Sequence, residues 1–160
     1  MFQKMLQCGS GGDDEVALKI TPMTGEYTGS CRAYADNYRS GNEGYKAFDG
    51  DSNTYCISSQ GGDNNNSLLY WFGKTGYIEN ISLLVSAAGV ATSTTNLKIY
   101  LLNLFGEWVN VTDFTYTGNT SAGKQLLTKN FARTNCIALK IDNLIVSNYS
   151  CIIHEVNVNV

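Results

Sequence analysis

The sequence predicts an all-β protein that folds as an antiparallel β-sandwich, and three observations support this fold class. First, no segment places apolar residues at helical spacing over several turns, so only a turn of helix is expected, around residues 42–48. Second, short segments rich in Val, Ile, Leu, Tyr and Trp recur along the chain. Third, polar connections rich in Gly, Asn, Asp, Ser and Thr separate these segments, as in sandwich folds.

The apolar segments define seven strands in chain order. The expected strands are 16–21, 67–72, 77–86, 96–102, 108–112, 135–142 and 152–160. Four long polar loops are expected at 29–44, 58–67, 87–95 and 116–129. Since binding residues of a rigid sandwich tend to lie in such loops, these four are the first places to look for function.

The last strand shows the clearest alternation of apolar and polar residues. One face is expected to hold Ile152, His154, Val156, Val158 and Val160, and the other Ile153, Glu155, Asn157 and Asn159. The first face is expected to join the core. Glu155 should therefore point away from the face that holds His154.

Size and composition limit the classes of protein to consider. The 160 residues suit one domain, which we expect at 16–160 after a flexible N-terminal segment at 1–15. A formal charge of −3 without a cluster of Lys or Arg excludes nucleic acid as a partner. No apolar run approaches the roughly 20 residues that cross a bilayer, so a soluble protein without membrane insertion is expected.

The five cysteines are an odd number without a C-x-x-C pair, so they predict neither a zinc site nor a complete disulfide framework. Cys136 and Cys151 lie in apolar segments and are expected to be small core residues. This pattern suits folding in a reducing cytoplasm, while a Cys31–Cys56 disulfide stays open. Cys8 follows an apolar stretch too short for a secretory signal, and a bacterial surface lipoprotein is kept as an alternative.

The segment from Tyr45 to Tyr55 gathers carboxylates, an amide, a hydroxyl and a turn glycine in one short loop. Asp49, Asp51 and Asn53 alternate as in an EF-hand, but Thr54 stands where that motif needs glycine, so an EF-hand is excluded. Two interpretations remain open. The loop is either a site for a hard cation, or an Asp-Gly turn whose side chains bond their own backbone.

Residue types do not predict catalysis. His154 is the one histidine, and its place on an apolar strand face favours a core role over a general base. Asp49 and Asp51 lie in a tight turn, which fits a filled cation site better than a catalytic pair of carboxylates. We therefore expect a protein that is not an enzyme.

Five short motifs follow one another along the chain: Ala47-Phe48-Asp49-Gly50-Asp51-Ser52-Asn53-Thr54-Tyr55-Cys56, Leu69-Tyr70-Trp71-Phe72-Gly73, Ile78-Glu79-Asn80-Ile81-Ser82-Leu83, Gly106-Glu107-Trp108-Val109-Asn110-Val111 and Ile153-His154-Glu155-Val156. Their order resembles that of the discoidin-like domains of the coagulation factor type C family and of family 32 carbohydrate-binding modules. The chain resembles this family from about residue 21 to 160. It departs at Cys56, where the family usually has Trp.

This resemblance implies a jelly-roll sandwich of discoidin-like type with a structural calcium ion. In the family a glutamate of the closing strand reaches the metal in the Asp-Gly loop. The implied ligands are Asp49, Asp51, Thr54, Glu155 and backbone carbonyls near Lys46.

The resemblance also implies binding of glycans through loops at one end of the sandwich. Tyrosine faces can stack on sugar rings, while Arg and Asn side chains bond hydroxyls. The candidate ligand-binding residues are Tyr38, Arg39 and Asn42 in the first polar loop and Asn64 in the second. For each of them a plain solvated loop residue is the alternative.

The function expected from these features is a lectin-like module that binds a cell-surface glycan. The opening peptide ahead of a compact β domain looks like that of small bacteriophage tail proteins, which implies assembly in the bacterial cytoplasm, a place in the virion and a role in host attachment. Weak single sites would then act together in several copies. The main alternative is a structural virion or surface protein that docks other virion proteins or forms homo-oligomers without binding sugar.

Overall fold

The computed structural model of the protein describes residues 16–36, 38–57, 66–89, 91–146 and 149–160. Its regular structure is antiparallel β-sheet with one short 3-10 helix, which confirms the predicted fold class. The predicted flexible segment, Cys8 and Asn64 lie outside the described residues. The elements are β1 (Tyr27–Thr28), β2 (Cys31–Ala35), η1 (Gly44–Ala47), β3 (Cys56–Ile57), β4 (Leu68–Ala88), β5 (Ser93–Leu102), β6 (Trp108–Gly118), β7 (Gln125–Asp142), β8 (Ile145–Val146) and β9 (Tyr149–Val158).

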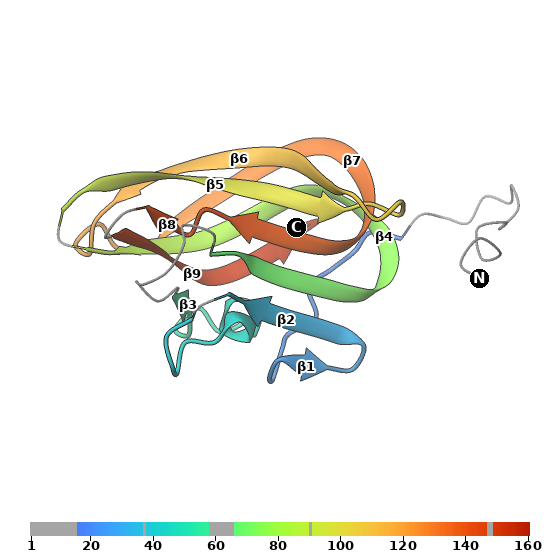
Figure 1. Ribbon diagram of the computed structural model, residues 1–160, viewed down its shortest axis with the longest axis horizontal. Coiled ribbons are helices and arrows are strands. Elements are labelled where there is room, and N and C mark those ends of the chain that lie inside the picture. The colour runs from blue at the N-terminus through green and yellow to red at the C-terminus, as the bar shows by residue number, and fades with distance from the viewer. Residues whose placement is uncertain (1–15, 37, 58–65, 90, 147–148) are drawn as a thin grey trace, which may run out of the picture.

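Two long strands, β4 and β7, run through both layers of the sandwich and curve together at one end of the molecule (Figure 1). The start of β4 and the end of β7 pair in a sheet with the order β1-β2-β4-β7-β5-β6. The rest of β4 lies between β7 and β9, and β9 also pairs with β3 and β8. The change of layer falls at the register shift between Trp71 and Gly76, where Gly73 has a φ of 68° that suits glycine.

The core lies between the two layers and consists of inward residues of both. In β4 the residues Leu68, Tyr70 and Phe72 are buried, and the rings of Phe48 and Phe72 lie 4.7 and 4.9 Å from the ring of Tyr70. Burial of each such side chain, compared with its exposure to water, stabilises the fold by about 1.5–3 kcal/mol. The alternate residues Leu69 and Trp71 therefore face outward.

Several predicted element boundaries were wrong. Residues 16–21 form only an isolated bridge between Ala17 and Tyr77, because this segment meets β4 where β4 bends. The predicted strands 67–72 and 77–86 are one strand, since pairing with β7 resumes after the bend. The predicted loop 29–44 contains β2, and the predicted loop 116–129 contains the end of β6 and the start of β7.

A β-bulge in β9 changes the predicted alternation of its faces. Glu155 pairs with Leu84 and Ile153 pairs with Val85, which leaves His154 as an extra residue. Ile153 is consequently buried beside His154, whereas Ile152 is only half-buried, contrary to the sequence prediction. Beyond the bulge, the core residues are Val156 and Val158, as predicted, and the terminal Val160 is exposed.

The four described cysteines are free thiols, so the Cys31–Cys56 disulfide that the sequence left open is not formed. Cys136 and Cys151 are buried core residues, as predicted. Among the described residues, no helix has the length and apolar character needed to cross a membrane.

Candidate functional site

The loop after η1 folds through hydrogen bonds of its own carboxylates. Asp49 Oδ1 accepts a hydrogen bond of 2.9 Å from the backbone N–H of Asp51, and Asp51 Oδ1 accepts one of 2.9 Å from the backbone N–H of Asn53. Gly50 has a φ of 77° at the corner of the turn, a conformation that residues with a side chain rarely adopt. The Asp-Gly turn, one of the two interpretations that the sequence left open, is therefore present, and it uses Asp49 Oδ1 but not Asp49 Oδ2.

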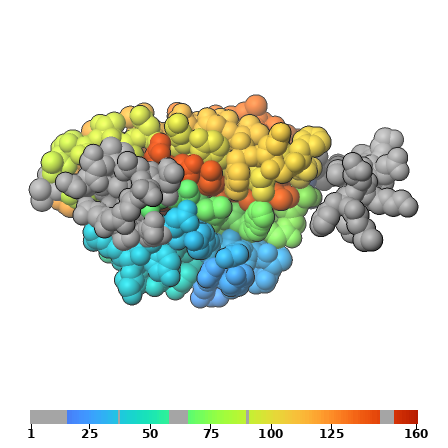
Figure 2. All heavy atoms as spheres, in the orientation of Figure 1, coloured from blue at the N-terminus to red at the C-terminus, as the bar shows by residue number. Residues whose placement is uncertain are grey.

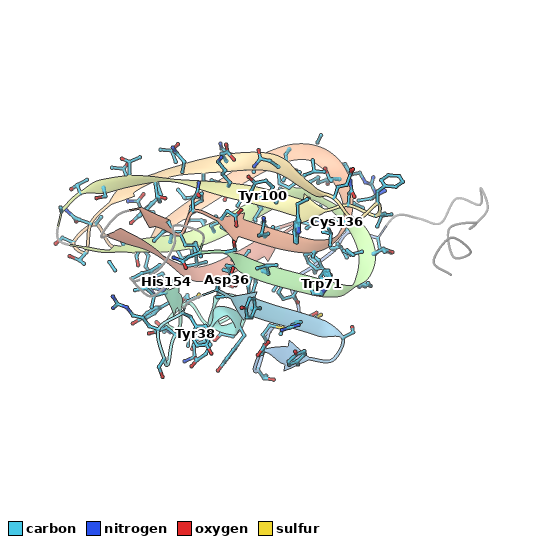
Figure 3. All side chains as sticks on the ribbon, viewed as in Figure 1. Asp36, Tyr38, Trp71, Tyr100, Cys136 and His154 are labelled. Carbon is cyan, nitrogen blue, oxygen red and sulfur yellow. The ribbon has the colours of Figure 1, made fainter. Side chains whose placement is uncertain are left out.

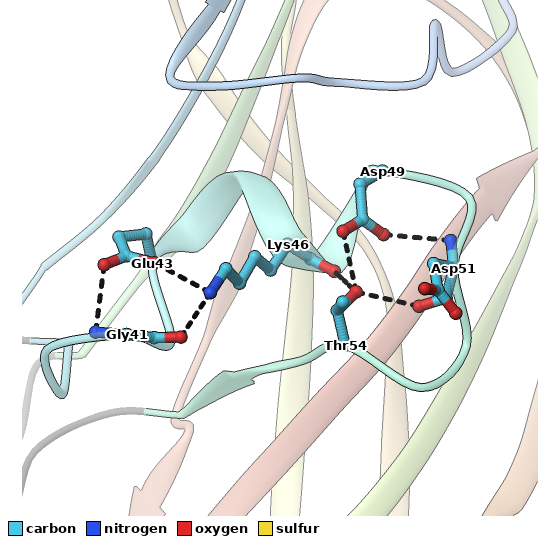
Figure 4. A network of polar contacts seen from close by, with 6 residues as sticks. All are labelled: Gly41, Glu43, Lys46, Asp49, Asp51 and Thr54. Carbon is cyan, nitrogen blue, oxygen red and sulfur yellow. Dashed lines mark hydrogen bonds and ion pairs between the residues drawn. The ribbon is translucent and has the colours of Figure 1, made fainter.

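The hydroxyl of Thr54 lies among three acceptor oxygens (Figure 4). Thr54 Oγ1 is 2.7 Å from Asp49 Oδ2, 2.8 Å from the carbonyl oxygen of Asp51 and 3.3 Å from that of Lys46. Since a hydroxyl has one proton, it donates to only one of these oxygens at a time. Carboxylate, carbonyl and hydroxyl oxygens thus meet at one point, and this is the type of oxygen set that calcium prefers.

The side chain of Lys46 points away from this oxygen set. Its Nζ donates to the carbonyl oxygen of Gly41 and lies 3.2 Å from Glu43 Oε2, so only its backbone is available to the loop (Figure 4). Glu43 Oε1 accepts a hydrogen bond of 2.9 Å from the N–H of Gly41. Hydrogen bonds from its own backbone and from Gly41, together with Lys46, lower the pKa of Glu43. The turn before η1 is therefore fixed by charged side chains.

Glu155, the remaining predicted calcium ligand, is not joined to the loop by a hydrogen bond among the described residues. Its Oε1 accepts a hydrogen bond of 3.0 Å from Asn157 Nδ2 on the same strand. Nor do the described residues contain a cluster of three His, Cys, Asp or Glu side chains suited to a metal. The candidate oxygen set is therefore built from one stretch of the chain, with carbonyl and hydroxyl oxygens beside the Asp49 carboxylate.

His154, a residue of β9 that Figure 3 labels, contacts Tyr55 at the end of this loop. The side chain is 6% exposed, its Nε2 is 2.8 Å from Ser86 Oγ, and its ring lies 5.4 Å from that of Tyr55. Burial and the charge of Lys124 lower its pKa, while the backbone of Thr54 and Ser52 acts in the opposite direction. Its buried Nδ1 has no well-aligned hydrogen bond. The core position was predicted, but the contact with the loop depends on the β9 bulge.

Lys124 also supports this loop. Its Nζ donates a hydrogen bond of 2.5 Å to the carbonyl oxygen of Ser52. Lys124 lies just before β7, so this contact spans 72 residues of sequence. The Asp49 loop is thus held by β9 and by the connection that precedes β7.

A second feature is a hollow of about 250 Å³ beside β2, which we call the tyrosine hollow. Three aromatic and two acidic side chains line it, namely Tyr34, Tyr38, Tyr45, Glu26 and Glu43. Tyr38 is 44% exposed, so its ring is accessible to a ligand. A hydrogen bond to Asp36 raises the pKa of Tyr34. Aromatic faces and carboxylates are together suited to a ligand with apolar and hydroxyl surfaces.

The structure brings the predicted ligand residues together only in part. Tyr38 lines the tyrosine hollow, whereas Arg39 and Asn42 lie in the adjoining turn, joined by a hydrogen bond of 2.8 Å from the N–H of Asn42 to the carbonyl oxygen of Arg39. Sequence reasoning missed Tyr45, and it assigned Tyr34 to the polar loop 29–44 and not to a strand. The signal for β2 was the alternation in Cys31-Arg32-Ala33-Tyr34-Ala35, which places Arg32 and Tyr34 on the face opposite to the small apolar residues.

Comparisons with known proteins support the fold. No protein-family model matches the chain, and no curated protein matches it. Several solved structures match the chain. The family 32 carbohydrate-binding module of Clostridium perfringens NanJ, in complex with galactose, is 23% identical with a TM-score of 0.65, over 81% of this chain and 93% of that one.

Two further structures are similar in the same way. CpGH89CBM32-5 of Clostridium perfringens, in complex with GalNAc-β-1,3-galactose, is 18% identical with a TM-score of 0.62, over 81% of this chain and 95% of that one. A pectin-binding carbohydrate-binding module is 20% identical with a TM-score of 0.61, over 80% of this chain and 88% of that one. The protein therefore has the discoidin-like β-sandwich fold of family 32 carbohydrate-binding modules.

Proposed function

We propose that this protein is a non-catalytic module that binds glycans through the tyrosine hollow. The observation that supports this proposal is the exposed ring of Tyr38 beside Glu26 and Glu43. A sugar ring offers C–H groups to an aromatic face and hydroxyl donors to carboxylates. Arg39 and Asn42, in the adjoining turn, would extend the polar contacts. The similar solved structures, which are carbohydrate-binding modules, agree with this class of ligand.

The test is a glycan array probed with the purified protein and with two tyrosine variants. Tyr38→Ala should weaken binding about tenfold or more, since it removes an exposed ring from the hollow. Tyr27→Ala is the matched control, because Tyr27 is an exposed tyrosine on β1 that does not line the hollow. The absence of array signal, even with a multivalent form of the protein at high density, would refute the proposal and favour the protein-docking alternative. Measuring the self-association of the protein would then test that alternative.

We further propose that the Asp49 loop holds a structural calcium ion. Lys46 and Asp51 would contribute carbonyl oxygens, and Asp49 and Thr54 would contribute side-chain oxygens. The support is the meeting of Thr54 Oγ1 with the three oxygens around it. Glu155 joins this set in the proposal only on the family resemblance. When bound, the ion would supply positive charge that holds these oxygens together.

Calcium bound to the folded state should raise the melting temperature, and an excess of chelator should lower it. Saturation at 100 times the dissociation constant would stabilise the fold by about 2.7 kcal/mol. Asp49→Asn and Thr54→Val should abolish the calcium dependence, whereas Asp113→Asn, an exposed carboxylate on β6, should retain it. Equal melting temperatures of the unsubstituted protein with calcium and with chelator would exclude the site.

The same proposal places the module in a phage virion, where repeated copies would bind a bacterial surface together. Its support is the resemblance of the opening peptide to phage tail proteins. The alternative location is the bacterial cell surface. Detection of the chain by mass spectrometry in purified virions, against its detection in a bacterial membrane fraction, decides between them.

A further inference from the structure

The outer face of the sheet β1-β2-β4-β7-β5-β6 contains both tryptophans of the chain. Cross-strand pairing aligns one row of residues over five strands, and this row is Arg32, Trp71, Ala138, Leu102 and Trp108. The small Ala138 lies between the larger neighbours. Side chains of β2, β4, β7 and β5 consequently meet on one broad face of the molecule (Figure 2).

This row encloses a hollow of about 350 Å³, which Arg32, Leu69, Trp71, Leu102 and Trp108 line. Trp71 also lines a second hollow of about 250 Å³, together with Lys74 and Thr75. We call these two hollows together the tryptophan groove. Trp71 is 38% exposed, so its ring is open to a ligand (Figure 3).

The charged residues of the tryptophan groove are all basic. Arg32 lines the first hollow and Lys74 the second, and the lining of the two contains no carboxylate. Lys140 lies at the edge, with its Nζ 4.6 Å from the ring centroid of Tyr100 and 5.2 Å from that of Trp108. Two of these cations are in ion pairs, since Lys140 Nζ is 3.2 Å from Asp142 Oδ2 and Arg32 Nη2 is 3.0 Å from Glu26 Oε1. The cation of the lining outside these ion pairs is Lys74, which the groove presents beside its aromatic faces.

We propose that the tryptophan groove binds a linear polysaccharide that bears carboxylate or sulfate groups. Its sugar rings would lie on Trp71 and Trp108, and its acid groups would meet Arg32 and Lys74. Two hollows that share Trp71 suit a chain of several sugars more than one terminal sugar. Arg32 also forms an ion pair of 3.0 Å with Glu26, so charge complementarity selects the acidic polymer mainly through Lys74, which is exposed in the second hollow. This site is separate from the Tyr38 side of the tyrosine hollow, although Tyr34 lines both.

Tryptophan fluorescence is a specific probe of this site, because the chain has two tryptophans and both line the groove. The full-length protein is titrated with oligogalacturonates of increasing length, with a sulfated carrageenan oligosaccharide and with neutral cello-oligosaccharides. We expect the emission to change with the two acidic series. Affinity should rise with chain length over the first few sugars and fall as salt is added, since salt screens exposed charges.

Variants separate stacking from charge. Trp71→Ala should weaken binding of the acidic oligosaccharides about tenfold, and Trp108→Phe should weaken it a few-fold. Trp108→Phe keeps an aromatic ring in place, so it tests the site even if Trp71→Ala does not fold. Lys74→Ala should weaken binding and reduce its salt dependence, while Lys98→Ala, an exposed lysine of β5 outside the groove, is the charge control. Because each tryptophan variant lacks one of the two fluorophores, its binding to the acidic polysaccharide is measured by affinity electrophoresis.

Equal affinity for neutral and acidic oligosaccharides, or acidic binding that Trp71→Ala, Trp108→Phe and Lys74→Ala all leave unchanged, would overturn the proposal. Failure here is distinct from failure of the proposed function. Array binding that depends on Tyr38 without any fluorescence change would refute the groove alone. A fluorescence response that Tyr38→Ala leaves intact, without any array signal that depends on Tyr38, would refute the tyrosine hollow alone.

Discussion

His154 links the Asp49 loop to the final strand through a buried imidazole. Because His154 is the extra residue of the β9 bulge, its ring reaches Tyr55 and the loop while Ile153 still enters the core. Burial disfavours the charged form and lowers the pKa of the ring. A positive charge on the ring would also lie near Lys124. The neutral imidazole is therefore the form that suits the folded protein.

The low pKa of His154 predicts that stability falls on acidification. The unfolded chain takes up a proton near the ordinary histidine pKa of about 6.5, before the folded protein does. The free energy of unfolding should therefore be unaffected by this group above that pH and should decrease as the pH falls below it. Urea unfolding of the unsubstituted protein and of His154→Gln at about pH 7.5 and about pH 5 measures this. Parallel pH dependences for the two proteins would contradict it.

Contacts between site residues that are close in sequence could be predicted. Contacts that depend on the pairing of distant strands could not. Lys46, Asp49, Asp51 and Thr54 were expected to meet, and they do, because they lie within one turn of chain. Trp71 and Trp108 line one hollow only through the pairing of β4 with β7, of β7 with β5 and of β5 with β6. The sequence alone shows no such pairing.

At the scale of elements, η1 packs against β2 with almost no space between them. A Cβ atom on Gly44 would lie 2.6 Å from the backbone nitrogen of Ala35 and 2.8 Å from its Cβ. Real Cβ atoms do not approach backbone so closely, so a side chain here would push η1 off the strand. This contact positions both Tyr45 and the loop that follows η1.

Gly44→Ala should destabilise the protein by about 1–3 kcal/mol, the usual cost of overpacking a tight contact. It should also weaken glycan binding at the tyrosine hollow, because Gly44 lies in the lining. Gly25→Ala is the matched control, since a Cβ there meets nothing within 4 Å. The free energies of unfolding of both variants in urea give the comparison, and equal values would show that η1 moves freely to accommodate the methyl group.

Strand type was easier to predict than strand ends. The segments rich in large apolar residues, such as 96–102 and 135–142, are indeed strands. The strand β2 was missed because its inward residues are Cys31, Ala33 and Ala35, whose small side chains give a weak apolar signal. The joining of two predicted strands into β4 was missed because Gly73 and Gly76 resemble a turn in sequence but form a bend within paired strands.

For the whole molecule, the buried thiols report on global unfolding. Cys31, Cys56, Cys136 and Cys151 are all buried in the core. Burial raises the pKa of Cys56 and of Cys136 to about 12, and it also raises the pKa of Cys151. The reactive thiolate is therefore scarce at neutral pH, and reagents have little access to these thiols.

In a Cys8→Ser background, we expect the native protein to resist a thiol reagent such as a maleimide. All four remaining thiols should react with the same dependence on urea as the loss of tryptophan fluorescence. Ser121→Cys, which adds a thiol at an exposed position, is the control for reagent activity and should react at once. Rapid labelling of one core cysteine without urea would instead indicate local opening of the strand that contains it.

The continuity of β4 and β7 through both layers couples distant surfaces. β4 contributes Trp71 to the groove and pairs with β9, whose His154 contacts the Asp49 loop, while β4 also pairs with β2 beside the tyrosine hollow. Neither sheet can come apart while the other stays intact, since each would lose half of two shared strands. A ligand at any one of these sites should therefore raise the melting temperature of the entire domain, and a single thermal-shift screen would detect ions, short glycans and long polymers alike.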